Sequence, residues 1–95
     1  MYVVHVTYTA PLPDIDPLRP AHGAWLTEAI AAKMLLMAGR QVPLTGGVYL
    51  VADMPRPQLD QLLATDPYLV RGVAEHTVTE FTPLLVAEGL ESLRG

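Results

Sequence analysis

The sequence contains two successive strand–helix–strand patterns, and this order constrains the fold more than any other feature. Residues 2–8 are a β-branched and aromatic run with one histidine, and the prolines of residues 11–13 end it. Residues 47–52 and 73–81 are typical of two further strands. A short strand is also expected over residues 40–44, where a proline restricts it to an edge or an irregular position.

Helical patterns separate these strands. The first predicted helix runs from about Pro17 or Pro20 to Ala38, and Gly39 closes it in the left-handed conformation. The second predicted helix begins at Pro57 and ends before the Asp-Pro pair at residues 66–67. After the last strand, residues 83–95 predict a short amphipathic helix whose apolar positions are Leu85, Leu90 and Leu93.

This order of elements predicts an α+β, ferredoxin-like βαββαβ subunit, with a four-stranded antiparallel sheet and both helices on one face. A chain of 95 residues suits one domain, with a core over residues 1–83 and an extension over residues 84–95. The other sheet face needs a cover, because Val3, His5 and Thr7 make it partly apolar. A second subunit in a twofold homodimer would supply that cover.

Composition excludes several functional classes. The net charge of −4, with Lys33 as the only lysine, argues against a nucleic-acid partner. The chain has no cysteine, so disulfides, thiolate zinc sites and cysteine nucleophiles are excluded. No apolar run approaches the roughly 20 residues that span a bilayer, and the first strand begins without a basic leader. We therefore expect a cytoplasmic protein without membrane association.

The sequence carries no motif for a cofactor. A G-x-G-x-x-G loop, a P-loop and a G-x-S-x-G elbow are all absent, so neither a nucleotide nor a flavin is expected. His5, His22 and His76 could be combined into a metal site, but no two of them have a close helical or strand ligand spacing. We therefore predict activity without metal or nucleotide.

One histidine and one aspartate are the best candidates for chemistry. His22 is in helical register with Leu26, Ile30 and Met34, which are expected to pack inward, and a polar group that faces a core needs a partner. Asp66 precedes a proline, which leaves its short side chain at a turn from which it can reach His22. Histidine titrates near neutrality and is suited to general acid or base catalysis.

Each candidate residue also has a purely structural alternative. His22 could be a satisfied histidine that ties helix to loop, and Asp66 could accept backbone N–H bonds near Tyr68 or Leu69. Arg19 could bind a substrate carboxylate, or point to solvent from the start of its helix. Tyr68 could line a substrate pocket or anchor the Asp-Pro turn.

Several spaced motifs resemble the YCII-related family of small bacterial proteins, within the dimeric α/β-barrel superfamily. The resemblance covers residue 2 to about residue 83 and rests on the Tyr-Val-Val opening strand, Arg-Pro-Ala-His at residues 19–22, Gly39, Asp-Pro-Tyr at residues 66–68, and Gly72. It implies a ferredoxin-like dimer with an active site at His22 and Asp66. The link between Gly39 and Gly47 is shorter here than the glycine- and proline-rich loop of relatives, which changes the rim of the expected pocket.

The resemblance also implies a reaction class, because some relatives are cofactor-independent lyases or isomerases of aromatic-derived ring compounds, including a dehydrochlorinase. The expected function is general acid/base chemistry by His22 and Asp66 on a small ring-containing metabolite, as a lyase, isomerase or hydrolase. The alternative is a non-catalytic module that binds a small molecule in the same cavity, or serves a metabolic pathway as an accessory protein.

Overall fold

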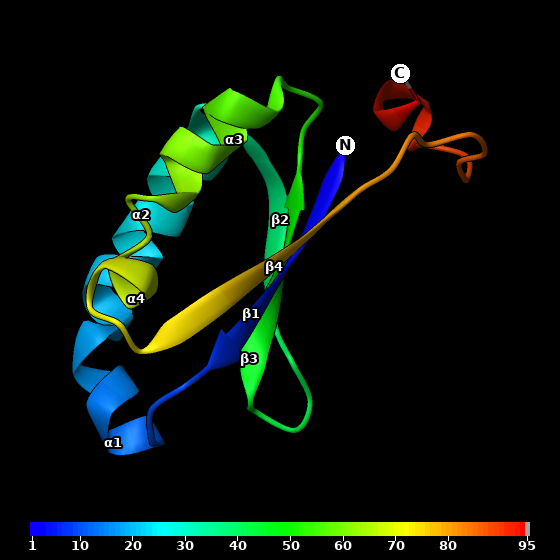
Figure 1. The fold of residues 1–95 in the computed structure, drawn as a ribbon. Coiled ribbons are helices and arrows are strands. Elements are labelled where there is room, and N and C mark those ends of the chain that lie inside the picture. The colour runs from blue at the N-terminus through cyan, green and yellow to red at the C-terminus, as the bar shows by residue number, and fades with distance from the viewer. Residues whose placement is uncertain (95) are drawn as a thin grey trace.

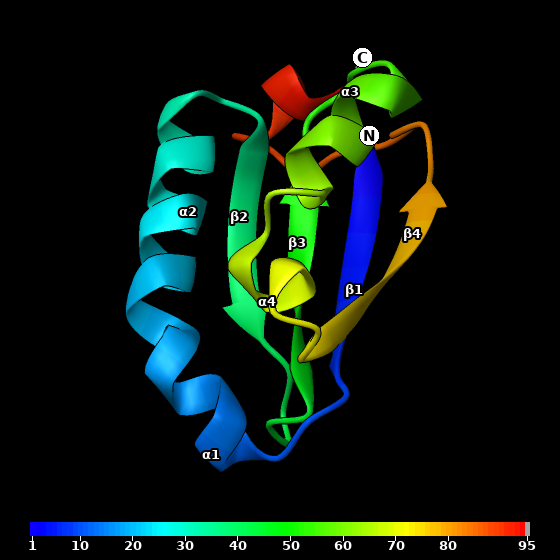
Figure 2. The same cartoon turned by 60° about the vertical axis from the view of Figure 1, so that its left-hand side comes forward.

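The computed structural model describes residues 1–94, and its centre is a four-stranded antiparallel sheet with strand order β2-β3-β1-β4 (Figure 1). The strands are β1 (Tyr2–Tyr8), β2 (Leu35–Arg40), β3 (Gly46–Val51) and β4 (Ala74–Glu80). The helices are α1 (Leu12–Ile15), α2 (Arg19–Ala31), α3 (Arg56–Leu63) and α4 (Pro67–Val70), with 3₁₀ turns η1 (Asp16–Leu18) and η2 (Glu91–Leu93). Figures 1 and 2 show α1 to α4 on one face of the sheet. The predicted α+β ferredoxin-like fold is confirmed.

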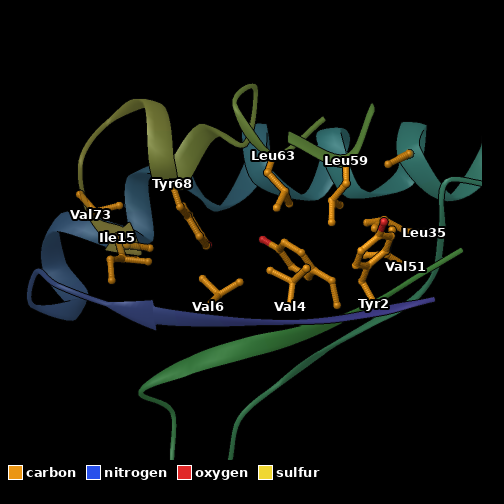
Figure 3. Close-up of a cluster of buried hydrophobic side chains, with 13 residues drawn as sticks. Tyr2, Val4, Val6, Ile15, Leu35, Val51, Leu59, Leu63, Tyr68 and Val73 are labelled. Carbon is orange, nitrogen blue, oxygen red and sulfur yellow. The ribbon is translucent and has the colours of Figure 1, made fainter. Parts of the chain in front are cut away.

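The core lies between the sheet and these helices because the strands alternate. Tyr2, Val4 and Val6 of β1 point toward the helices, and Leu59 and Leu63 of α3 lie over Tyr2 and Val4 (Figure 3). All five side chains are at most 5% exposed. The alternation of residues 2–8 in the sequence therefore identifies the buried face correctly.

The opposite sheet face carries none of α1 to α4, and the tail after β4, with η2, lies on this side at the upper end of the sheet (Figure 1). The register places Val3 beside Leu50 of β3, and His5 beside Val48 of the same strand. Met37 of β2 lies next to Leu50 and is 59% exposed. We refer to this surface, formed by Val3, His5, Met37, Val48 and Leu50, as the open face.

The predicted first helix is wrong at its C-terminal end, since α2 stops at Ala31 rather than Ala38. Lys33 adopts a left-handed φ of 60°, and the chain then forms β2. Residues 35–38 are good helix formers, but they pair with β3 instead, so tertiary pairing overrides local propensity. Gly39 consequently lies inside a strand and does not cap a helix.

This early end also corrects the predicted inward stripe of the helix. Ile30 is exposed, and Met34 lies beyond the helix, so only His22 and Leu26 of that stripe face inward. The short strand expected over residues 40–44 is wrong as well, because Arg40 ends β2 and residues 41–45 form the loop to β3. The tail does not form the predicted amphipathic helix: within residues 83–94 the only helical segment is η2. Gly95 lies outside the described residues.

The remaining predicted elements agree with the structure within one or two residues, including β1, β3, β4 and the helix near Pro57. No helix among residues 1–94 is both long enough and apolar enough to cross a membrane.

Candidate functional site

The candidate site is a cavity of about 250 Å³ between α2 and the sheet. His22 reaches it from the first turn of α2, Tyr49 from β3, and Tyr68 from α4. Its wall on the sheet side is partly bare backbone, because Gly46 lines it. This position requires glycine, since a Cβ there would overlap the carbonyl of Val6. The volume falls below the roughly 300 to 1,000 Å³ of drug-sized pockets, which suits a small metabolite.

Asp66 lies beneath the cavity and is fully buried. Its Oδ2 accepts a hydrogen bond from the Tyr49 hydroxyl at 2.7 Å, and its Oδ1 accepts one from the Tyr68 backbone N–H at 2.9 Å. Nε2 of His22 lies 2.7 Å from the same Tyr49 hydroxyl and 3.6 Å from Oδ1 of Asp66. The structure thus brings the two predicted residues together, with Tyr49 as the intermediate link.

The hydrogen bonds to Asp66 determine its charge. Burial alone would raise the pKa of Asp66, but hydrogen bonds from His76, Tyr49 and the Tyr68 N–H together hold it below the ordinary value of 3.8. Asp66 is therefore an ionised carboxylate at neutral pH and can only accept hydrogen bonds.

This charge fixes the direction of the whole chain of hydrogen bonds. Burial, followed by the neighbouring Asp66 charge, raises the pKa of Tyr49 well above 10.0, so its hydroxyl stays protonated. This hydroxyl donates a hydrogen bond to Asp66. The Tyr49 oxygen must then accept from His22, which places a proton on Nε2 of the imidazole. Neutral His22 consequently has an unprotonated Nδ1.

Nδ1 of His22 is an accessible nitrogen without a hydrogen-bond partner in the described chain. Within residues 1–94, every fully buried side-chain nitrogen or oxygen has a hydrogen-bond partner, and His22 bonds through Nε2 alone. Nδ1 is therefore accessible, and His22 lines the cavity. Burial lowers the pKa of His22 below 6.5, against the opposing effect of Asp66, so this nitrogen is an available base at neutral pH.

Aromatic rings hold the imidazole in place. The Tyr68 ring stacks on His22 with centroids 3.7 Å apart and planes 10° from parallel. Trp25, one turn along α2, is a second aromatic neighbour, and its ring centroid lies 6.0 Å from that of His22. Tyr68 thus both lines the cavity and anchors the Asp-Pro turn, so the two alternatives considered for it are compatible.

Arg19 lines the cavity as well, and its Nε donates a 2.8 Å hydrogen bond to Asp16. Arg19 is therefore ion-paired beside the cavity, and its side chain is 29% exposed. All four residues predicted for the site, His22, Asp66, Arg19 and Tyr68, therefore lie at or directly beneath one cavity.

Sequence reasoning missed two members of this arrangement. Tyr49 lies in an apolar strand and resembles an ordinary core residue. His76 was considered only as a metal ligand, yet its Nε2 donates to Oδ2 of Asp66 at 2.9 Å. A usable signal was present for His76, because a histidine between Ala74 and Val78 on the buried face of a strand requires a polar partner.

Replacing Tyr49 with phenylalanine is expected to disconnect His22 from Asp66. The ring remains, but Nε2 of His22 loses its acceptor, so the stability should fall by about 1 to 3 kcal/mol. Loss of orientation should reduce turnover by up to about a hundredfold. Tyr2→Phe is the matched control, since it also removes a buried hydroxyl that donates a hydrogen bond, to the Met54 carbonyl, away from the cavity. Equal effects of the two variants on turnover would contradict a role for the Tyr49 hydroxyl.

Comparisons with known proteins agree with this fold. Residues 1–82 match the model of the YCII-related domain. A search of curated proteins finds no match. Among solved structures, the chain is similar to 5-chloro-2-hydroxyhydroquinone dehydrochlorinase from Burkholderia phenoliruptrix in complex with 2,5-dihydroxybenzoquinone, with a TM-score of 0.71 and 16% identity. The similarity covers 86% of this chain and 94% of the other.

Proposed function

The chain belongs to the family of the YCII-related domain, and from this premise we propose that it is a cofactor-independent enzyme in which His22 moves a proton on a small ring-containing metabolite. The observation that carries the proposal is the accessible Nδ1 of His22, in an imidazole whose other nitrogen is bound to the Tyr49–Asp66 pair. The solved dehydrochlorinase, bound to a hydroxyquinone, supports a ring compound as the substrate class.

The proposed chemistry begins with proton abstraction. Nδ1 of His22 takes a proton from an acidic C–H or O–H of the substrate and becomes imidazolium. The buried Asp66 charge, acting through Tyr49 and across 3.6 Å, stabilises that cation. The electron pair left on the substrate expels a leaving group in an elimination, or shifts a double bond in an isomerisation. His22 then returns the proton to the leaving group or to a second carbon.

A metabolite library of small ring compounds, incubated in D₂O, tests this proposal. Mass spectrometry should detect product formation, or deuterium uptake into a substrate, with the wild-type protein. His22→Gln is the control, because its amide can replace the Nε2 donor but offers no basic nitrogen. Ligand binding without exchange or turnover in either protein would instead support the alternative of a non-catalytic binding or accessory module.

We also propose that the protein is a homodimer whose subunits meet through the open face. Val3, Val48 and Leu50 are half-buried there without a helix to cover them. Burying two such faces against each other would remove apolar surface from water.

The expected cytoplasmic location of the protein also stays a prediction.

The dimer makes a measurable prediction. Sedimentation should give twice the 10.3 kDa chain mass at micromolar concentration. Val48→Glu places two charges at the centre of the interface and should yield monomers, because unpaired buried charges are strongly unfavourable. Gln61→Glu on the exposed surface of α3 is the control and should stay dimeric. A wild-type protein that sediments as a monomer in physiological salt would refute this assembly.

A further inference from the structure

The charge of the cavity lining is opposite to that of the whole protein. The chain carries a net charge of −4 and has only six lysines and arginines. Two of these six, Arg19 and Arg40, line the cavity, whereas no aspartate or glutamate of the described chain does. Asp66 is charged as well, but it lies beneath the lining and already accepts three hydrogen bonds, so the positive groups of the lining face the cavity and attract anions.

Arg40 contributes most of this uncompensated charge. It is the last residue of β2 and pairs with Gly47, two residues before Tyr49, so alternation places it on the helix side of the sheet. Gly47 has no side chain to cover the guanidinium. Within residues 1–94, Arg40 forms no ion pair with a carboxylate, unlike Arg19, which Asp16 partly neutralises.

Arg40 also acts electrostatically on the opposite wall. Burial raises the pKa of the Tyr68 phenol, and Arg40 and Arg19 are among the charges that oppose this rise. Tyr68 stacks directly on His22, so the two arginines and the catalytic candidate lie around one space.

We propose that Arg40, assisted by Arg19, selects a substrate that enters as an oxyanion, in the form of an ionised enol, phenol or carboxylic acid. This assignment rests on the proposed function, because it adds the substrate's charge to a site whose base is His22. The planar guanidinium binds the ionised oxygen with charge-assisted hydrogen bonds, which orients the substrate ring toward Nδ1 of His22. One oxygen of the substrate is then already ionised and bound by Arg40, and the ring position that loses the next proton lies at Nδ1 of His22.

Two matched pairs of probes test the charge requirement by calorimetry. The first pair is 2,5-dihydroxybenzoquinone, whose hydroxyl groups are acidic because the conjugate base is delocalised over the ring, and 2,5-dimethoxybenzoquinone, which cannot ionise. The second pair is 3,4-dihydroxybenzoate and its methyl ester. We expect the wild-type protein to bind at least one acid more tightly than its neutral partner, and added salt should weaken that preference.

Arg40→Gln should weaken binding of the acid by roughly ten- to a hundredfold and leave the neutral partner unchanged. Arg71→Gln is the control, because it removes the same charge from an exposed position outside the cavity. Equal binding of acid and neutral partner, binding of neither acid, or equal loss in both arginine variants would overturn the assignment.

The test separates this inference from the proposed function. His22→Gln should keep the preference for the acid, since both arginines remain. An anion preference without any His22-dependent proton exchange would refute the proposed chemistry alone. His22-dependent exchange on a neutral substrate, with Arg40→Gln fully active, would refute the anion assignment alone.

Discussion

Replacing His22 by alanine is expected to reduce turnover by about a hundred- to ten-thousand-fold, which is the usual contribution of a positioned general base. The fold and the proposed dimer should remain, because the side chain lines a cavity from the first turn of α2. His22→Gln should regain part of any lost thermal stability through its amide donor, while turnover remains lost. This difference distinguishes a chemical role of His22 from a purely structural one.

Glu28→Ala, on the exposed surface of the same helix, is the control for these variants and should leave turnover unchanged. The wild-type rate should fall as the pH drops through the His22 pKa, because a base must be deprotonated to act. That pKa lies below 6.5, so the acid limb of kcat/KM should also lie below 6.5. Turnover by His22→Gln at more than a tenth of the wild-type rate would contradict a role as the base.

Replacing Asp66 by alanine is expected to cost about 3 to 5 kcal/mol of folding free energy. The change leaves three donors without their acceptor in a buried place: the Tyr49 hydroxyl, Nε2 of His76 and the Tyr68 N–H. It also removes the N-cap of α4. Chemical denaturation of the wild type and the variant measures this loss.

Asp66→Asn keeps the shape but removes the charge, and should cost about 1 to 3 kcal/mol. The pKa of folded Asp66 lies below the ordinary 3.8, so its charge stabilises the fold above pH 3.8, and this contribution disappears as the pH falls through the folded value. The stability difference between wild type and Asp66→Asn should therefore shrink in acid. A difference that stays constant from pH 7 down to pH 2 would show that Asp66 is not a stabilised carboxylate.

The same variant tests the coupling of the pair. The Asp66 charge raises the pKa of His22 against the effect of burial, so Asp66→Asn should move the acid limb of activity to lower pH. Combined with His22→Ala, its effect on turnover should be far from additive, because the two groups act as one unit.

Local sequence signals predicted much of the fold because the buried faces alternate regularly. The Tyr2–Tyr8 run identified both faces of β1, and the prolines and glycines marked most turns. The boundary between α2 and β2 could not be predicted in this way. Residues 35–38 are compatible with a helix, and only hydrogen bonding to β3, more than ten residues away, makes them a strand.

The candidate site was predicted only in part, because some of its residues carry local sequence signals and others reach the site only through long-range pairing. His22 and Asp66 carry visible local signals, namely a helical register and an Asp-Pro turn. Tyr49 becomes a connecting residue only when the pairing of β1 with β3 brings its hydroxyl between them. Arg40 lines the cavity only because β2 replaces the predicted end of the helix.

The protonation of His22 in the ligand-free protein tests the central claim most directly, and it requires no substrate. Nitrogen-15 NMR of imidazole-labelled protein, with His22→Gln to assign the signals, reports which ring nitrogen carries the proton. We predict a neutral His22 at pH 7, protonated on Nε2 with a free Nδ1, that titrates below pH 6.5. A proton on Nδ1, or an imidazolium that persists at pH 7, would contradict it.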